Sequence, residues 1–492
     1  MRKGPWIRAD KLVYAEIPNL HQAVNELKDE GLISVDEPAP ADHLLDLFTL
    51  PELGASFPHT RRRFRPQGKA AWVNCLLSNY PEDVLRHRIQ DHLHWLRVAG
   101  QESLARMQLL YFGSPSADLT AFVLRDLGMI RYEIYPVEES ATVLVAPGVL
   151  DRYRELVVLE KWFDFLPVID GLTKSLHARL VKPVTLRAAE RRRSRLLNTL
   201  GLWHERREDV DRALACYACS SRHPARERQV RLLTRTHREF EAELLLEAMA
   251  ARSWCVEEEI FAERFSKQRG LKQPDECLIR ERPLFEPGPP PNPGAIEAHA
   301  LAELETEGAW GLHLENVLPL MLTGLAFWDV IFGPAPGAFT HPFQSAPHDL
   351  WWDDFAKARA APLQQARAAF ASHRDPQSII QARYLEKYGT ACDLVNWRAI
   401  DPDQLARILK VMPTETLKRL VDVVIQAPGR CRTGFPDLFV AWPDGTCEFV
   451  EVKGPSDQLQ PQQRAWLKRL GALAIPASVL KYRRRRETSC AT

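Results

Sequence analysis

The chain has no long hydrophobic run and almost no net charge. No apolar stretch in its 492 residues approaches the roughly 18 residues of a membrane-spanning helix. The opening segment has no signal-type hydrophobic core, so we expect a cytoplasmic protein without membrane association. The 65 Lys and Arg residues nearly balance the 64 Asp and Glu residues, which leaves a net charge of +1. Binding of an acidic polymer must therefore depend on local basic patches.

Cysteine is scarce and poorly placed for cross-links or zinc. The nine cysteines are odd in number, and most lie in apolar or helical contexts, which favours reduced thiols in a cytoplasm. Cys216, Cys219 and His223 have the spacing of part of a zinc site. A structural zinc site needs four ligands, however, and no second pair is suitably spaced. Helix packing around Cys216 and Tyr217 is the favoured interpretation.

Length and composition indicate several domains. A chain of this length typically contains about three. The proline-rich segment at 287–294 cannot continue a helix and predicts a linker. We therefore expect a helical N-terminal module over 1–90, a mainly helical domain over 91–286, and a C-terminal domain over 295–492. Short strands are expected near Ile130 to Pro136 and Ala141 to Val145.

The strongest chemical pattern is a pair of strand-like runs separated by Asp444-Gly445, a hairpin turn signal. Such a hairpin places Asp437 opposite Glu451, and Glu451 shares a face with Lys453 because strand side chains alternate. Converging carboxylates are rarely tolerated without a cation between them, and hard oxygen ligands suit Mg²⁺ or Mn²⁺. This PD-(D/E)xK spacing predicts metal-assisted phosphodiester hydrolysis. The alternative is a surface hairpin with solvated charges.

The residues after Lys453 predict a loop, a helix and another strand. Asp457 is expected to cap the helix, with Trp466 and Leu470 facing the core. The apolar run from Ile475 to Leu480 predicts the strand. Strand, strand, helix, strand is the minimal core of this nuclease class.

The run from Phe435 to Leu459, with Gln463, resembles a VRR-NUC domain, and nearly the whole chain resembles the Fanconi-associated nuclease family. Phe48 to Leu53, followed by Gly68-Lys69, resembles the family's SAP-type DNA-binding module. Leu200 to Tyr217 is similar to one helix pair of a tetratricopeptide repeat (TPR). The resemblance implies a multidomain, mainly α protein with an α/β nuclease core, a SAP-like helical N-terminal module and a TPR-like helical arm.

The resemblance also implies roles for individual residues. Asp437, Glu451 and Glu315 would bind one or two divalent ions, and the Val452 carbonyl would be a backbone ligand. Lys453 would be the catalytic lysine. Two polar positions would flank the site, namely Asp457 and Gln463.

The implied activity is structure-specific cleavage of branched DNA, especially 5′ flaps, together with 5′ to 3′ exonuclease action, in interstrand crosslink repair. We expect a monomer or a DNA-induced dimer in a bacterial nucleoid, without the family's ubiquitin-binding zinc module. Two alternatives stay open. One is a Holliday-junction resolvase, which would need two symmetry-related sites. The other is a non-catalytic DNA-repair scaffold.

DNA contacts are expected from clustered cations, which neutralise phosphates without reading sequence. The candidates are Arg61, Arg63, Arg65, Lys69, Arg191, Arg226, Arg228, Arg430 and Arg432. Solvated charge runs and salt bridges within helices are the alternatives, and the basic run at 481–486 has the same two interpretations. At the positions of the family's pocket for a terminal 5′ phosphate, the chain has uncharged Gly429 and Gln462.

Overall fold

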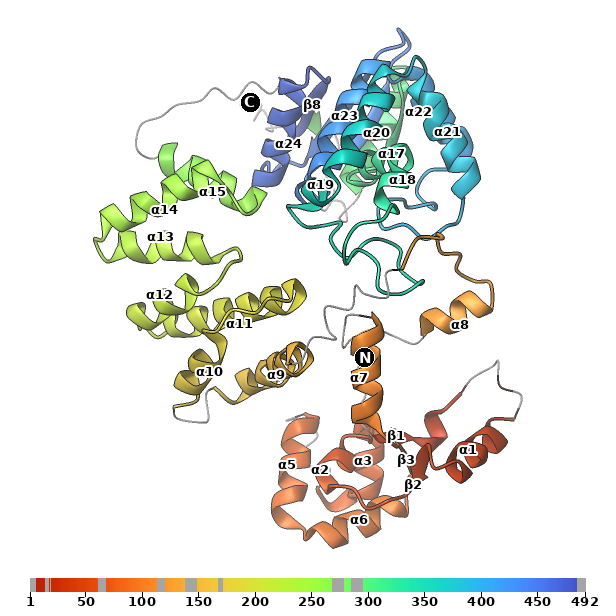
Figure 1. The fold of residues 1–492 in the computed structure, drawn as a ribbon, viewed down its shortest axis with the longest axis vertical. Coiled ribbons are helices and arrows are strands. Elements are labelled where there is room, and N and C mark those ends of the chain that lie inside the picture. Colours follow the sequence, from red (N-terminus) through yellow and green to blue (C-terminus); the bar gives the residue numbers. More distant parts are fainter. Residues whose placement is uncertain are drawn as a thin grey trace, which may run out of the picture. The chain divides into compact units, whose positions relative to one another are not determined.

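The computed structural model describes residues 6–13, 17, 19–60, 68–112, 120–137, 148–166, 171–267, 278–284 and 295–484. The chain forms two compact units, Met1–Ala117 and Asp118–Thr492 (Figure 1). The predicted linker at 287–294 lies outside the described residues, as do the strand predicted at 141–145 and the cations Arg61, Arg63 and Arg65. The boundaries predicted at 90 and 286 stay predictions.

The first unit combines short helices with a small antiparallel sheet. Its elements are β1 (Trp6–Arg8), α1 (Leu20–Asp29), β2 (Ile33–Val35), α2 (Ala41–Leu45), α3 (Leu50–Ser56), α5 (Lys69–Asn79), α6 (Glu82–Gln90), β3 (Trp95–Val98) and α7 (Gln101–Phe112). The sheet has the order β1-β3-β2. Only helices were predicted here, because strands of three or four residues are too short to show alternation. Trp72, Trp95 and Leu53 are fully buried in the core.

Helix α3 begins with a capping box. The Thr49 backbone N–H donates to Glu52 Oε2 at 2.7 Å, and Pro51 lies in the first turn. Arg8 donates to the same carboxylate oxygen at 2.5 Å. This hydrogen bond is the main reason why the pKa of Glu52 falls to about 2. The contact ties β1 to α3.

The second unit begins with a stack of helices, here called the arm. After α8 (Thr120–Asp126), which is not part of the stack, they are α9 (Val149–Trp162), α10 (Leu172–Leu180), α11 (Arg187–Glu205), α12 (Val210–Ala218), α13 (Ala225–Arg235), α14 (Glu239–Ala251) and α15 (Val256–Lys267). Helices α11 to α15 each pack on the next, which produces the layered stack in Figure 1. The strand predicted at 130–136 is wrong, because the described residues there form only an isolated bridge between Arg131 and Thr390.

Buried polar contacts hold the arm together. Arg193 is 4% exposed and donates to the Glu190 carboxylate at 2.6 and 2.7 Å, and to the carbonyl oxygen of Cys219 at 2.8 Å. Cys216 is buried beside Tyr217, as the packing interpretation predicted. In the part of the chain that the structure describes, no group of His, Cys, Asp and Glu side chains is positioned as a ready metal site.

The rest of the second unit is built around a mixed five-stranded sheet of order β4-β8-β7-β6-β5. Its strands are β4 (Leu278–Leu284), β5 (Trp310–His313), β6 (Leu438–Ala441), β7 (Cys447–Lys453) and β8 (Ala477–Arg484). Strands β5, β6 and β7 pair antiparallel, whereas β8 runs parallel to both β7 and β4. The helices around it are α16 (Ala295–Thr306), α17 (Val317–Ala326), α18 (Trp328–Ile331), α19 (Phe355–Ala358), α20 (Ala360–Ser372), α21 (Pro376–Lys387), α22 (Pro402–Val411), α23 (Thr414–Gln426) and α24 (Pro461–Ala472).

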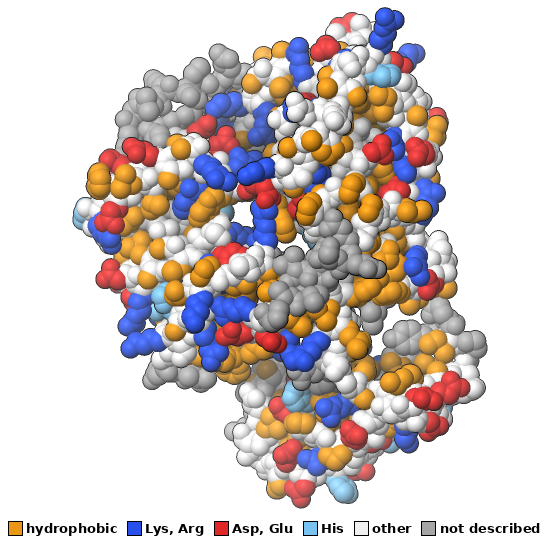
Figure 2. Space-filling model, viewed as in Figure 1, with side chains coloured by type: hydrophobic (Ala, Val, Ile, Leu, Met, Phe, Trp, Pro, Cys, Tyr) orange, Lys and Arg blue, Asp and Glu red, His pale blue; other side chains and the backbone are white. Residues whose placement is uncertain are grey.

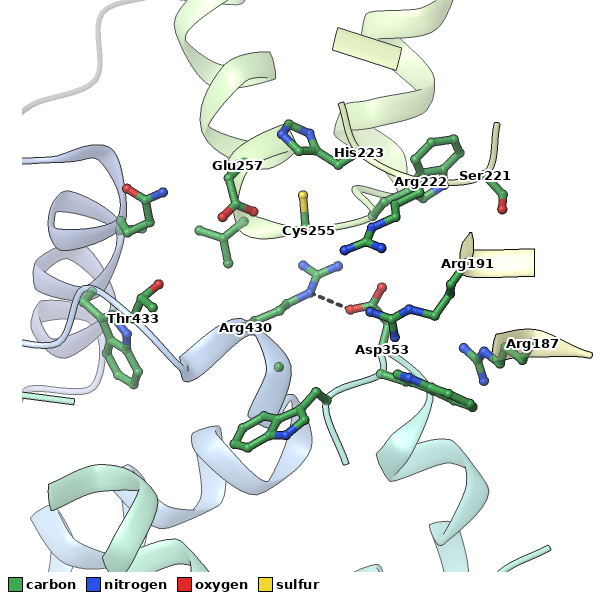
Figure 3. A pocket seen from close by; sticks show the side chains of 18 of the residues that line it. Arg187, Arg191, Ser221, Arg222, His223, Cys255, Glu257, Asp353, Arg430 and Thr433 are labelled. Atoms are coloured by element: carbon green, nitrogen blue, oxygen red, sulfur yellow. Dashed lines mark ion pairs between the residues drawn. The ribbon is translucent and has the colours of Figure 1, made fainter. Parts of the chain in front are cut away.

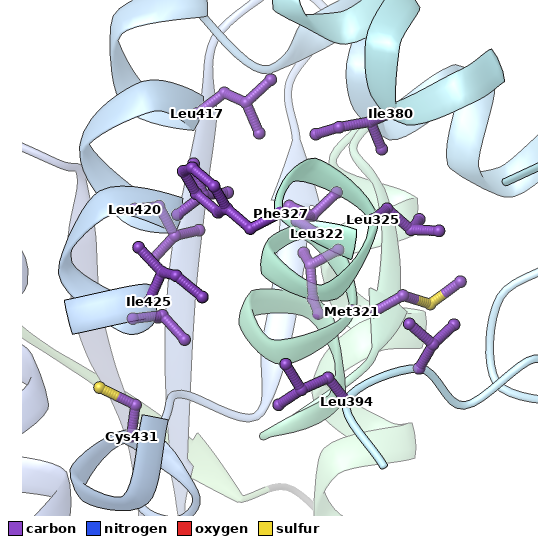
Figure 4. Close-up of a cluster of buried hydrophobic side chains, with 14 of the residues drawn as sticks. Met321, Leu322, Leu325, Phe327, Ile380, Leu394, Leu417, Leu420, Ile425 and Cys431 are labelled. Carbon is purple, nitrogen blue, oxygen red and sulfur yellow. The ribbon is translucent and has the colours of Figure 1, made fainter. Parts of the chain in front are cut away.

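Helix α17 is the centre of the main core. Met321, Leu322 and Leu325 are fully buried, and Figure 4 shows their side chains between α23 and α21. A single helix was predicted from 317 to 332. The helix instead ends at Phe327, whose φ of −118° and ψ of 27° are not helical and whose ring packs on Phe370. None of the described helices is long and apolar enough to cross a membrane.

Candidate active site and the basic cavity

The predicted hairpin is confirmed. Strand β6 pairs with β7 in a register that sets Leu438 against Val450, so that Asp437 and Glu451 lie opposite each other one step further. The turn is closed by a hydrogen bond from the Trp442 N–H to the Thr446 carbonyl oxygen at 2.8 Å. Within it the Thr446 N–H donates to Asp444 Oδ1 at 2.9 Å, and Gly445 has a φ of +85°, which favours glycine.

A backbone contact brings Glu315 to the same edge of the sheet. The carbonyl oxygen of Asp437 accepts the N–H groups of Leu314 at 3.0 Å and Glu315 at 2.9 Å, where β5 ends. Asn316 then connects both segments. Its side-chain oxygen accepts the Phe435 N–H at 3.0 Å, and its amide nitrogen donates to Glu315 Oε1 at 3.0 Å. Glu315 has a φ of +38°, a strained conformation for a side chain of this type that costs about 1–2 kcal/mol.

The carboxylates at this edge are buried and poorly neutralised. Glu451 is completely buried, and neither of its carboxylate oxygens has a hydrogen bond of good geometry to the described residues. Lys453 Nζ lies 2.6 Å from Glu451 Oε1 and is its ion-pair partner. Burial and the Asp437 carboxylate raise the pKa of Glu451 to about 8, against the opposing effect of Lys453. Burial also raises the pKa of Asp437.

The donor set fits a hard divalent cation. Asp437 and Glu451 supply buried carboxylate oxygens, Glu315 supplies an exposed one, and the Val452 carbonyl directly follows Glu451 in the sequence. Among the described residues no three such side chains already converge at ligand distances. Glu451 is turned to Lys453, and Asp437 Oδ2 accepts the Val452 N–H at 2.8 Å.

The two flanking polar residues have structural contacts. Asp457 accepts the Gly454 N–H at 3.0 Å, so the prediction that it caps the following helix is wrong. The cap of α24 is Gln460, whose N–H donates to Gln463 Oε1 at 2.8 Å in a capping box. Pro461 fixes this start, because proline is favoured at the first helical position.

A basic cavity of about 510 Å³ lies between the arm and the residues just before β6. Figure 2 shows blue Lys and Arg side chains gathered around a hollow in the second unit, and Figure 3 shows the interior of the cavity. The arginines that line it are Arg187 and Arg191 of α11, Arg222, Arg430 and Arg469 of α24. Aromatic lining residues are Trp254, Trp351, Trp352 and Trp466.

Positive charge in this cavity exceeds the local negative charge. Arg430 donates to the Ser253 carbonyl oxygen at 2.8 Å and lies 3.6 Å from Asp353. No described carboxylate lies within the 4.0 Å ion-pair limit of Arg191 or Arg222. Burial and the guanidinium groups of Arg222 and Arg187 lower the pKa of Arg191. Such crowding of cations favours an anionic ligand.

The other predicted DNA-binding cations have protein partners. Arg226 is buried, ion-paired with Glu258 at 2.5 Å and stacked 4.0 Å from the centre of the Trp254 ring. Arg228 lies 3.3 Å from Glu205. Lys69 donates to the Asp46 carbonyl oxygen at 2.6 Å. Arg432 is exposed and stacks on Trp351 at 4.4 Å.

Arg187, Arg222 and Asn316 were missed in the sequence. Arg187 and Arg191 are four residues apart on one helix, so their shared face could have been deduced from helical periodicity. Arg222 and Asn316 lie outside regular periodic patterns, and no local signal distinguishes them from surface polar residues.

Comparisons with known proteins show which family this chain resembles along its length. The family described as "VRR-NUC domain" matches residues 371–483. A Fanconi-associated nuclease 1 homolog from Pseudomonas aeruginosa is 31% identical, with 97% of this chain and 86% of that protein covered. A homolog of the same name from Arabidopsis thaliana is 25% identical over 95% of this chain and 60% of its own length.

Solved structures match along nearly the whole chain. A crystal structure of paFAN1 bound to 5′ flap DNA with a gap and a two-nucleotide flap has a TM-score of 0.79 and 28% identity, and the match covers 99% of this chain and 90% of that one. A second structure of paFAN1, with a one-nucleotide flap, has a TM-score of 0.77.

Proposed function

Because the chain belongs to the Fanconi-associated nuclease family and is a structure-specific DNA nuclease, we propose that it cuts DNA near the junction of a 5′ flap, at the hairpin edge. The buried carboxylate of Glu451, which lacks a good hydrogen bond and lies beside Asp437, is the observation that carries this assignment. A buried carboxylate with incomplete pairing is costly, and it is retained where a ligand supplies the missing partner.

Enzymes of this family depend on divalent metal ions. Asp437, Glu451, Glu315 and the Val452 carbonyl would hold one or two such ions, and their hard oxygen atoms favour Mg²⁺ or Mn²⁺. When bound, the cation stabilises negative charge on the scissile phosphate and lowers the pKa of an attacking water.

Lys453 acts as the catalytic lysine in this proposal. It is 9% exposed and lies 2.6 Å from Glu451 Oε1, so the carboxylate holds the ammonium at the edge of the sheet. With Glu451 held by a cation, the Lys453 ammonium would be free to donate to a phosphate oxygen or to orient the water. Asn316 positions Glu315 for the same site through its amide.

The basic cavity binds a phosphate of the flapped DNA. Thr433 lines the cavity and precedes Asp437 by four residues, a chain that spans at most about 14 Å, so the cavity and the hairpin edge lie close enough to contact one DNA strand together. Gly429 leaves no room for a side chain, because a Cβ there would lie 2.6 Å from the Trp351 carbonyl oxygen. Arg191, Arg222 and Arg430 therefore supply the charge that Gly429 and Gln462 lack.

The other helical parts of the chain are proposed to hold the DNA substrate. The arm and the N-terminal module, predicted over residues 1–90, contact the duplexes beside the junction, and recognition depends on DNA shape with few base contacts. We propose action as a monomer, or as a dimer formed on DNA, in interstrand crosslink repair at a bacterial nucleoid. The Pseudomonas relative supports the bacterial setting.

A cleavage assay tests the proposal. A labelled 5′ flap and a matched linear duplex are incubated with protein in Mg²⁺, Mn²⁺ or EDTA, beside the variants Asp437→Asn and Asp403→Asn. Asp403 is an exposed carboxylate in the first turn of α22 and is the matched control. Metal-dependent cutting near the junction is expected, lost only in Asp437→Asn, with DNA binding unchanged. If no branched DNA is cut while binding stays tight, the scaffold alternative replaces the nuclease.

A further inference from the structure

Helix α16 runs along the sheet toward the catalytic edge. Its C-terminal end lies beside the hairpin turn, because a Cβ on Gly308 would meet Pro443 Cγ at 3.3 Å. Ala300 and Leu304 are fully buried and pack against the sheet face formed by Leu438, Val440, Val450 and Val452. The N-terminal end of the helix therefore points to the opposite end of β6, where Asp437 lies.

The lengths of the two elements place Glu297 level with the start of β6. From Gly308 back to Glu297 the chain rises about 16 Å at roughly 1.5 Å per helical residue. From Pro443 back to Leu438 the strand covers about the same length at roughly 3.3 Å per residue. Glu297 also precedes Ala300 and Leu304 by three and seven residues, so it faces the sheet as they do.

Two glutamates near the end of this helix, Glu303 within it and Glu307 just after it, have partners that Glu297 lacks. Glu303 accepts a hydrogen bond from the Tyr482 hydroxyl at 2.5 Å, and Glu307 lies 2.7 Å from Arg282. In contrast, Oε2 of Glu297 is buried and has no hydrogen-bond partner in the described part of the chain. Glu297 and Glu315 are also two of the charges that raise the pKa of Asp437, which is due mainly to burial.

We infer that Glu297 is a further carboxylate of the divalent-cation site, reaching Asp437 from the sheet face opposite to Glu451. Side chains alternate along β7, so Glu451 and Lys453 lie on one face and Val452 packs with α16 on the other. Asp437 lies just before the first residue of β6, level with Glu297 of α16. Asp437 thus joins two carboxylate pairs, one with Glu451 and one with Glu297, and each pair can hold one cation. This inference rests on the proposed nuclease function.

Cation binding measured without DNA tests the inference. Mn²⁺ is titrated calorimetrically into the metal-free full chain, the variant Glu297→Gln and the control Glu305→Gln. Glu305 is an exposed glutamate of the same helix, so both variants remove one negative charge from α16. Glu297→Gln is expected to lose one of two Mn²⁺ binding events, or at least tenfold in affinity, whereas Glu305→Gln matches the parent protein.

Thermal unfolding distinguishes a cation role from a structural one. Without metal, Glu297→Gln should have the same melting temperature as the parent protein or a higher one. The buried Glu297 oxygen has no hydrogen-bond partner among the described residues, so removing its charge breaks no stabilising contact. With Mn²⁺, its melting temperature should rise less than that of Glu305→Gln. Unchanged Mn²⁺ affinity in Glu297→Gln would overturn the inference while leaving the nuclease intact. Failure of the parent protein to bind Mn²⁺ at all would overturn the proposed function itself.

Discussion

At the end of the β6–β7 hairpin, acidic side chains face one another, whereas in the cavity arginines do. Glu451 is buried beside Asp437 with Lys453 as its ion-pair partner, and Arg191 lies beside Arg222 and Arg187 with no carboxylate in ion-pair range among the described residues. The two regions carry charges of opposite sign, and both lack enough partners of the other sign. The carboxylate of Glu451 is buried and the guanidinium of Arg191 is half-buried, and each lacks a full set of partners of opposite charge. In each region the missing partner has the sign of one component of a nuclease reaction.

Elsewhere in the arm, buried arginines have partners of opposite charge. Arg193 lies two residues from Arg191 on α11, yet it is bonded to Glu190 and to two carbonyl oxygens. Arg226 is similarly paired with Glu258. Incomplete pairing is therefore a local property of the two sites and not a general feature of this fold.

The largest expected effect distinguishes a paired arginine from an unpaired one. Arg226→Met leaves Glu258 buried without its cation and should lower the free energy of unfolding by about 3–5 kcal/mol. Arg191→Met should change it little, because the variant relieves repulsion between cations. Urea unfolding of the full-length variants measures both. Equal destabilisation would mean that Arg191 is a structural residue.

The next effect concerns the acidic edge. Lys453→Met should lower the cleavage rate of a 5′ flap by about 10²- to 10³-fold, because a donor that acts on the transition state is lost. Flap affinity should be unchanged. The control is Lys468→Met, which removes an exposed lysine of α24. If Lys453→Met cleaves the flap at the parent rate, Lys453 takes no part in the reaction.

A smaller effect is expected in the cavity. Arg191→Met and Arg222→Met should each weaken flap binding by about tenfold and reduce the salt dependence of binding by about one phosphate contact. Arg195→Met is the matched control on α11, because its exposed side chain pairs with Glu160. Flap affinity measured over a range of salt concentrations separates the variants. The same salt slope for all three would show that no phosphate is bound in the cavity.

The smallest expected effect concerns the ion pair between Arg8 and Glu52 in the first unit. The pKa of Glu52 is lowered to about 2 by its hydrogen bond from Arg8, so its stabilisation is complete above the unfolded value near 4.5 and is lost as the pH falls toward 2. The side chain is 31% exposed, so the contribution is about 1 kcal/mol or less. Amide exchange of α3 in the parent protein and Glu52→Gln should differ at pH 7 and converge as the pH falls toward 2. A constant difference would assign the effect to packing.

Local patterns in the sequence were sufficient for the hairpin, the order of strands and helix around it, and the helical character of the arm. Alternating side chains and a turn signal act over a few residues, so the opposition of Asp437 and Glu451 could be predicted. Local competition explains the errors nearby. Pro461 moved the helix start away from Asp457, and Phe327 packs into the core and interrupts the helix predicted at 317–332.

Tertiary structure alone decided which distant side chains join the site. Glu315 had been assigned only by resemblance, and two backbone hydrogen bonds to the Asp437 carbonyl bring it to the sheet edge. Glu297 reaches that edge by the direction of α16, and Arg191 and Arg222 meet Arg430 only because the arm packs beside the residues before β6. Periodicity defines which face of an element a residue occupies. Only the packing of separate elements defines what that face meets, because burial of apolar surface is non-directional and brings together residues far apart in the chain.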